Sequence, residues 1–98
     1  MLVTTERLYA KSGREAELAE RLEALAQAVR GEAGCREVRL ARSLHEGGVF
    51  VMLARYEGES ALDEHVRAEH YTEALPALMD CLEVPPEVAI FEEIAEPA

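Results

Sequence analysis

The chain has 98 residues and a net charge of −10, and we expect one acidic domain spanning residues 1–98. Hydrophobic residues make up 49% of it, which is too large a share for a disordered protein. Nucleic acids and anionic membranes are bound through clustered Lys and Arg, so 20 acids against 10 bases argue against both kinds of partner.

No segment of the sequence indicates export or membrane insertion. Met1 leads directly into a strand-like run, and no apolar run approaches the roughly 20 residues of a membrane-spanning helix. Cys35 and Cys81 form no C-x-x-C motif and are expected to be buried free thiols. We therefore expect a cytoplasmic protein.

The N-terminal part predicts a strand followed by a helix. Residues 2–10 are rich in β-branched and aromatic residues, which favour a strand. Within 14–30, apolar residues share one helical stripe: Ala16, Leu18, Ala19, Leu22, Leu25, Ala26 and Val29. Gly31 and Gly34 are expected to end this helix.

A hairpin is predicted next. Residues 35–44 favour a polar, edge-type strand, H-E-G-G at 45–48 is a turn signal, and 49–56 favours a second strand. The second strand is apolar on both faces, with Phe50, Met52, Ala54 and Tyr56 on one and Val49, Val51 and Leu53 on the other. Both faces must therefore be covered.

A second helical region is predicted from Ser60 to about Leu82. Ser60 and Asp63 have the spacing of a capping box. A break is expected near 67–69, and another at Pro76, because proline has no amide hydrogen to donate within a helix.

Residues 88–94 predict a last strand, and the acidic tail 95–98 is expected to fray. The order is βαββαβ, which predicts an α+β, ferredoxin-like fold with two helices on one face of a four-stranded antiparallel sheet. The other sheet face would be bare in a monomer although the strand over 49–56 makes it apolar. A homodimer with sheets packed face to face is the simplest cover.

Two of the three histidines lie close together, in D-E-H-V-R-A-E-H-Y at residues 63–71. On one continuous helix, residues five apart are about 140° apart around the axis, so His65 and His70 are not expected to converge on one ion. A break in the helix would bring them closer but would still leave two ligands without a third. We therefore predict no metal site.

An acid/base or binding role in an apolar pocket fits the same residues. His65 follows Leu62 by three positions, on or beside the buried helix face. It is either a half-buried histidine that bonds to the backbone or a pocket group that holds or moves a proton near neutral pH. Tyr71 is expected to pack in the core, with its hydroxyl seeking a partner. Either Glu6 or Arg7 must point into a covered face, where a charge is costly unless paired.

Four segments carry a resemblance to a known family: the first strand running into K-S-G-R-E-A-E-L, G-C at 34–35, V-F-V-M-L-A-R-Y, and E-S-A-L-D-E-H-V-R-A-E-H-Y. Together, over about residues 2–94, they resemble the antibiotic-biosynthesis-monooxygenase (ABM) domain family of the dimeric α+β barrel superfamily. The family signature is an aromatic, a small loop, A-L-x-x-H and then H-aromatic. Its positions here are Tyr56, Ala61-Leu62, His65 and His70-Tyr71.

The resemblance implies a homodimer whose two sheets form a barrel, with a pocket between sheet and helices in each subunit. Characterised members include cofactor-independent monooxygenases that oxidise multi-ring phenols or quinols with O₂. Their substrate, once deprotonated, reduces oxygen, and the protein supplies an apolar pocket, a proton acceptor and hydrogen bonds. The resemblance implies no cofactor, and the implied catalytic residues are His65 and Tyr71. The implied contacts to a small aromatic ligand are Tyr56, His70, Glu6, Arg7 and Met52.

The sequence also departs from the family pattern. Tyr56 stands where the family often has Trp, and Ala54 where an acid is common. The haem-degrading branch resembles the chain in layout, but Leu75 stands at the place of its haem-ligating His, so haem degradation is not expected. Two alternatives stay open: a non-catalytic small-molecule-binding homodimer that uses the same pocket, and an isomerase or lyase of the same superfamily.

Overall fold

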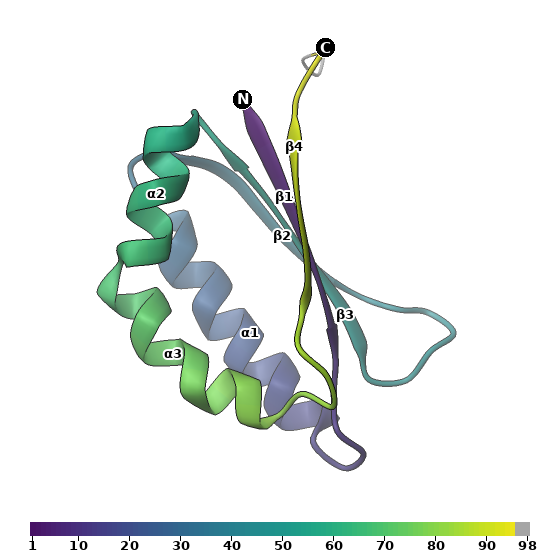
Figure 1. Ribbon diagram of the computed structural model, residues 1–98. Helices are drawn as coiled ribbons and strands as arrows, with labels where there is room; N and C mark the ends of the chain where they lie inside the picture. The colour runs from purple at the N-terminus through teal and green to yellow at the C-terminus, as the bar shows by residue number, and fades with distance from the viewer. Residues whose placement is uncertain (96–98) are drawn as a thin grey trace.

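The computed structural model describes residues 1–95 and confirms the predicted βαββαβ order, with the second helical region in two pieces (Figure 1). The elements are β1 (Leu2–Tyr9), α1 (Glu15–Arg30), β2 (Cys35–Arg42), β3 (Val49–Tyr56), α2 (Glu59–Arg67), α3 (Glu69–Asp80) and β4 (Glu87–Glu92). Residues 96–98 of the tail predicted to fray lie outside the described residues. Within 1–95, no helix has the length and apolar character needed to cross a membrane.

The four strands form one antiparallel sheet in the order β2-β3-β1-β4, and the helices cover one of its faces (Figure 1). Side chains alternate between the two faces of a strand. Glu6 of β1 lies opposite Met52 of β3 on one side and Val88 of β4 on the other, and all three belong to the helix-covered face. Arg7 and Val51 are paired on the open face.

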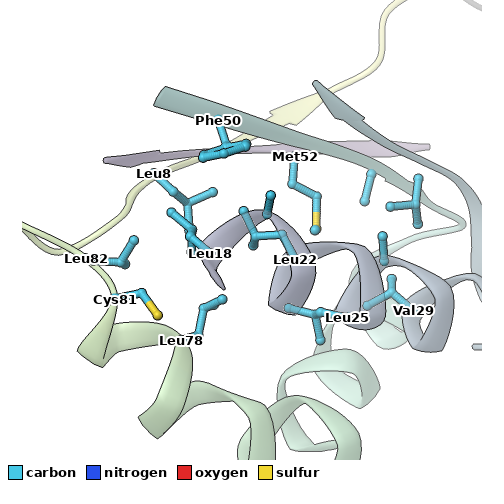
Figure 2. Close-up of a cluster of buried hydrophobic side chains, with 14 of the residues drawn as sticks. Leu8, Leu18, Leu22, Leu25, Val29, Phe50, Met52, Leu78, Cys81 and Leu82 are labelled. Atoms are coloured by element: carbon cyan, nitrogen blue, oxygen red, sulfur yellow. The ribbon is translucent and has the colours of Figure 1, made fainter. Parts of the chain in front are cut away.

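The core lies between the covered face of the sheet and helices α1 and α3 (Figure 2). Its largest fully buried aliphatic side chains come from all three elements: Leu8, Leu18, Leu22, Leu78 and Val29. Burying a side chain of this kind contributes roughly 1.5–3 kcal/mol. The predicted stripe of α1 is confirmed except at Ala16, which is exposed in the first turn.

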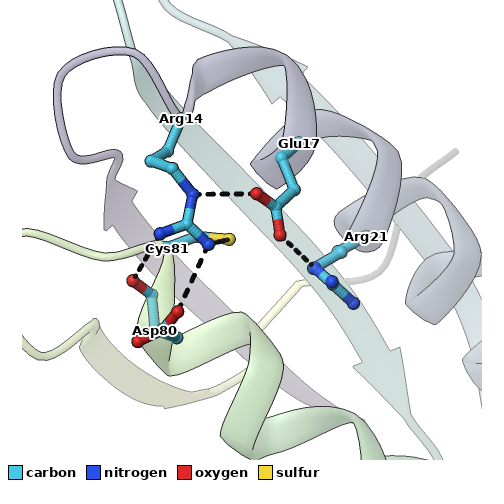
Figure 3. Close-up of polar contacts among 5 residues, drawn as sticks. All are labelled: Arg14, Glu17, Arg21, Asp80 and Cys81. Atoms are coloured by element: carbon cyan, nitrogen blue, oxygen red, sulfur yellow. Dashed lines mark hydrogen bonds and ion pairs between the residues drawn. The ribbon is translucent and has the colours of Figure 1, made fainter.

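A polar network fastens the start of α1 to the end of α3 (Figure 3). The Arg14 guanidinium donates to Glu17, 2.8 Å away, and lies 3.3 Å from both the Asp80 carboxylate and the Cys81 sulfur. Arg21 donates to the second oxygen of Glu17 at 2.9 Å. The bonds from Arg14 and Arg21 lower the pKa of Glu17 to about 2. The network helps to fix how the two helices lie against each other.

Two predicted details of the second helical region are wrong. α2 begins at Glu59 after Gly58, without a capping hydrogen bond from a side chain, so Ser60 and Asp63 form no capping box. Pro76 lies inside α3 without ending it. Pro76 and Thr72, whose carbonyl loses its helical donor, are both exposed, so water can satisfy that carbonyl.

The loop between α1 and β2 packs tightly against α2 at Gly34. A Cβ added to Gly34 would overlap the Cβ of Ala61, and the Gly34 carbonyl accepts a 2.9 Å hydrogen bond from the amide of Glu57. We expect Gly34→Ala to lower the free energy of unfolding by about 1–3 kcal/mol, as overpacking does. Urea denaturation measures the loss. Gly47→Ala is the control, because nothing lies within 4 Å of a Cβ added there. Equal losses in the two variants would contradict the contact.

Candidate functional site

The helix break between α2 and α3 sets the geometry of the candidate site. Ala68 is extended, with φ −65° and ψ 138°, and its amide donates to the carbonyl of His65 at 3.1 Å. This confirms the break predicted near 67–69. Because the chain changes direction there, the His65 and His70 rings reach the same carboxylate. His65 Nδ1 lies 2.8 Å and His70 Nε2 lies 2.5 Å from Glu32 Oε2.

The expectation that the two histidines do not converge is therefore wrong. It assumed a continuous helix, and it found no third group because Glu32 lies far away in sequence, in the loop that follows α1. One ligand atom from each of Glu32, His65 and His70 lies within 4.8 Å of the other two. The sequence offered little to single out Glu32: it is one acid among 20, placed between two glycines that end a helix.

The three groups differ in how much water they meet. The side chains of Glu32 and His65 are 12% and 13% exposed, and His70 is 34% exposed. Within residues 1–95, the second carboxylate oxygen of Glu32, Oε1, is buried without a hydrogen-bond partner. Leaving such an oxygen unsatisfied costs free energy.

Glu32 determines which nitrogen of His65 is free to react. A carboxylate oxygen only accepts hydrogen bonds, so a neutral His65 places its proton on Nδ1, facing Glu32. Nε2 is then the nitrogen that can accept a proton. This is the arrangement in which a carboxylate orients a histidine general base.

His65 lines a cleft between the edge of the sheet and helices α2 and α3. The cleft has a volume of about 110 Å³, and its walls include Glu6, Leu62, His65, Val66, Tyr71 and Ile90. Val88 and Ile90 of the edge strand β4 are 60% and 58% exposed, so the cleft is open on that side. A few polar groups converge in mostly apolar surroundings, as in small-molecule sites.

Two tyrosines flank the His65 ring. The ring centroid of Tyr56 lies 5.3 Å away and that of Tyr71 lies 4.5 Å away, both tilted. Burial is the largest cause raising the pKa of both hydroxyls. Both therefore stay protonated at neutral pH and can donate hydrogen bonds. Tyr56 is 2% exposed and packs against His65 without lining the cleft, whereas Tyr71 lines the cleft.

The structure brings together some of the residues predicted for the site and separates others. Those that line the cleft are Glu6, His65 and Tyr71. Tyr56 and His70 contact His65 or its partner Glu32 without lining the cleft. Met52 is buried in the core, and Arg7 is exposed on the opposite face of the sheet. The core side chains Met52, Phe50 and Leu78 do not line the cleft.

Burial in the cleft wall raises the pKa of Glu6, an effect that His65 partly opposes. A carboxyl with a raised pKa binds its proton more tightly in the folded protein, so the folded state loses stability as pH rises above the ordinary value of 4.5. Glu6→Gln is therefore expected to be more stable than the wild type at pH 7, with the difference vanishing towards pH 4. Urea denaturation at both pH values measures this.

The control for Glu6→Gln is Glu64→Gln on the exposed side of α2, which should leave stability unchanged at both pH values. Equal stability of Glu6→Gln and the wild type at pH 7 would contradict a cost of burying this carboxylate. A difference of the same size at pH 4 would contradict it too.

Comparisons with known proteins agree with this architecture. The sequence profile of the family described as "Antibiotic biosynthesis monooxygenase" (ABM) matches residues 1–77. Rv0793 from Mycobacterium tuberculosis is 28% identical over 99% of this chain and 98% of that chain, with a TM-score of 0.92. Among curated proteins there is no match.

Two further solved structures share the fold at lower identity. A conserved protein from Methanosarcina mazei Go1 is 24% identical, covers 94% of this chain and 91% of that chain, and has a TM-score of 0.88. An antibiotic biosynthesis monooxygenase is 21% identical, covers 97% and 100%, and has a TM-score of 0.89. Because its profile match extends over more than half of the sequence, the chain belongs to the ABM family.

Proposed function

We propose that this protein is a cofactor-independent monooxygenase that oxidises a small aromatic or quinol-like molecule with O₂. One observation carries the proposal: His65, held at Nδ1 by Glu32, lines an apolar cleft beside Glu6 and Tyr71. Its Nε2 is then available to accept a proton. The description of the family as a monooxygenase supports the class of reaction.

The proposed reaction begins with a proton transfer. His65 Nε2 removes a proton from the substrate, and the resulting anion is electron-rich enough to reduce O₂. For a substrate with an activated CH₂ group, one oxygen atom becomes the C=O of the product. The other leaves as water with the two hydrogens of that CH₂. The substrate supplies all the electrons, so the balance needs no external reductant.

The other cleft residues support this chemistry. The Tyr71 hydroxyl, whose pKa is raised, can donate a hydrogen bond to the oxygen on which negative charge develops. Glu6 also lines the cleft and can accept a hydrogen bond from a substrate hydroxyl. Leu62, Val66 and Ile90 provide an apolar surface for the ring.

Oxygen consumption tests the proposal. The protein is incubated under air with dihydroxynaphthalene- and anthrone-type compounds while dissolved O₂ and the product spectrum are followed. We expect one O₂ consumed for each molecule of quinone formed. Absence of uptake across the panel would overturn the monooxygenase proposal. Thermal stabilisation by a ligand without uptake would favour the binding-only alternative, and conversion without uptake would favour an isomerase or lyase.

We also propose that two copies form a homodimer with their open sheet faces packed together. Alternation along the strands gives that face Val3, Val51, Leu53 and Phe91, and Phe91 is 52% exposed in the single chain. Apolar side chains that a single chain leaves partly uncovered on one sheet face indicate an interaction surface. A second copy with the same face is a self-complementary cover, as twofold symmetry requires.

A further inference from the structure

We propose that Glu32, His65 and His70 form a binding site for one divalent first-row transition-metal ion. The three residues come from separate elements: the loop after α1, helix α2 and helix α3. Two imidazole nitrogens and a carboxylate oxygen meet at one place, all within 4.8 Å of one another. The observation is independent of the proposed oxidation, and the inference does not rest on it.

The chemistry of the donors selects the class of ion. Two imidazoles and one carboxylate suit Zn²⁺, Co²⁺ or Fe²⁺, whereas Ca²⁺ and Mg²⁺ prefer sites made of oxygen ligands alone. Three protein ligands leave the fourth coordination position open for water or a small ligand, as in catalytic zinc sites. We therefore assign the site to the zinc-like class.

The spacing of the donors is close to what such an ion needs. Bonds of about 2.0–2.2 Å in a tetrahedral site separate neighbouring ligand atoms by about 3.4 Å. The two imidazole nitrogens lie 2.8 Å and 2.5 Å from Glu32 Oε2, so each of these two separations must widen by less than about 1 Å to hold an ion. His70, on the more exposed side of the cluster, has room for that movement.

The unpartnered oxygen of Glu32 is a second observation that points to a cation. Oε1 is buried and accepts no hydrogen bond within residues 1–95, while Oε2 faces both imidazoles. A buried carboxylate is costly unless its charge is balanced and its oxygens are bonded. A divalent ion would balance that charge, and Oε1 is available as a further ligand.

Solvent can reach the cluster at His70, which is 34% exposed and does not line the cleft. His70 lines an open groove of about 250 Å³ between α1 and α3, whereas His65 lines the cleft. A metal ion therefore has a route of entry that does not pass through the cleft. The tight contact of Gly34 with Ala61 holds the Glu32 loop against α2, so the donors are positioned before an ion arrives.

Metal binding has a consequence for His65. Coordination through Nδ1 uses the lone pair on that nitrogen, so a neutral ring must carry its proton on Nε2. Nε2 is the nitrogen that the proposed oxidation uses as a base. The metal-bound protein and the protein with a free base are therefore alternative states, and added Zn²⁺ is expected to suppress any His65-dependent proton transfer.

The experiment is a metal titration of full-length protein first freed of metal by dialysis against EDTA. Zn²⁺ binding is measured by calorimetry, and Co²⁺ binding by its visible absorption bands. We expect one ion per chain with a micromolar or lower dissociation constant. Glu32→Gln and His70→Ala should each weaken binding at least tenfold, whereas His45→Ala, in the exposed turn between β2 and β3, should not change it.

The comparison between the histidine variants decides the outcome. Circular dichroism confirms that each variant is folded, and His70→Ala, at a partly exposed position, is the variant that best preserves the core. The site would be refuted if His70→Ala bound metal as tightly as the wild type. It would equally be refuted by several weak ions per chain, as expected from a surface rich in acids, or by the absence of binding.

Discussion

His65→Ala is expected to lower kcat for oxygen-dependent substrate oxidation by about 10²–10⁴-fold, the range typical of a lost general base. His65 is the one histidine among residues 1–95 that lines the cleft, and Glu32 holds its Nδ1. Since the base acts in the transition state, the loss should appear in kcat with little change in KM. Stopped-flow or electrode measurements of O₂ uptake with the best substrate of the panel check this.

Two further variants make this prediction specific. Glu32→Gln should lower kcat by about 10–100-fold, because an amide can donate to His65 Nδ1 and so no longer fixes the position of the proton. His45→Ala removes an exposed histidine and should leave kcat unchanged. Wild-type turnover in His65→Ala would remove this residue from the reaction and favour the packed, hydrogen-bonded interpretation of its role.

Leu53→Asp is expected to dissociate the proposed dimer. Leu53 lies opposite Thr5 and Arg39 on the open face of the sheet, and Arg39 is already paired with Glu37. A second sheet would therefore bury the new carboxylate without a partner of its own. Burying an unpaired charge costs several kcal/mol, which corresponds to a rise in the dimer dissociation constant of about 100-fold or more. Light scattering coupled to size-exclusion chromatography at micromolar concentration measures the mass.

The matched control for Leu53→Asp is Ala16→Asp, which adds the same charge to an exposed position in the first turn of α1. This variant should keep the mass of a dimer. Circular dichroism is needed to show that Leu53→Asp is folded, as expected for a side chain that packs outside the core of the single chain. A wild-type protein that runs as a monomer would contradict the proposed association.

The fold could be predicted from the sequence because the signals that carry it are local. The stripe of α1 and the two-faced apolar pattern of β3 follow directly from helical and strand periodicity. Alternation along β1 predicts that Glu6 and Arg7 point to opposite faces of the sheet. Which of the two faces the helices follows only from the register with β3. Local signals failed at Pro76, where the exposed side of α3 tolerates the missing hydrogen bond.

The candidate site is formed by contacts between residues far apart in the sequence, which local sequence patterns do not predict. Glu32 lies 33 residues from His65 and 38 from His70 along the chain, and the sequence gives no sign of which loop acid reaches them. The break near Ala68 could be predicted, but the direction that it gives to α3 could not. The cleft also needs Ile90, which reaches it only because β4 pairs beside β1.

The central claim is that Glu32 holds His65 so that Nε2 faces the substrate as a base. Nitrogen NMR of ¹⁵N-histidine-labelled, metal-free protein tests it directly, because long-range ¹H–¹⁵N couplings show which nitrogen of a neutral ring carries the proton. We predict that neutral His65 carries its proton on Nδ1, that Glu32→Gln weakens this preference, and that a phenolic ligand shifts the Nε2 resonance. A neutral His65 protonated at Nε2, with no response to Glu32→Gln or to the ligand, would contradict it.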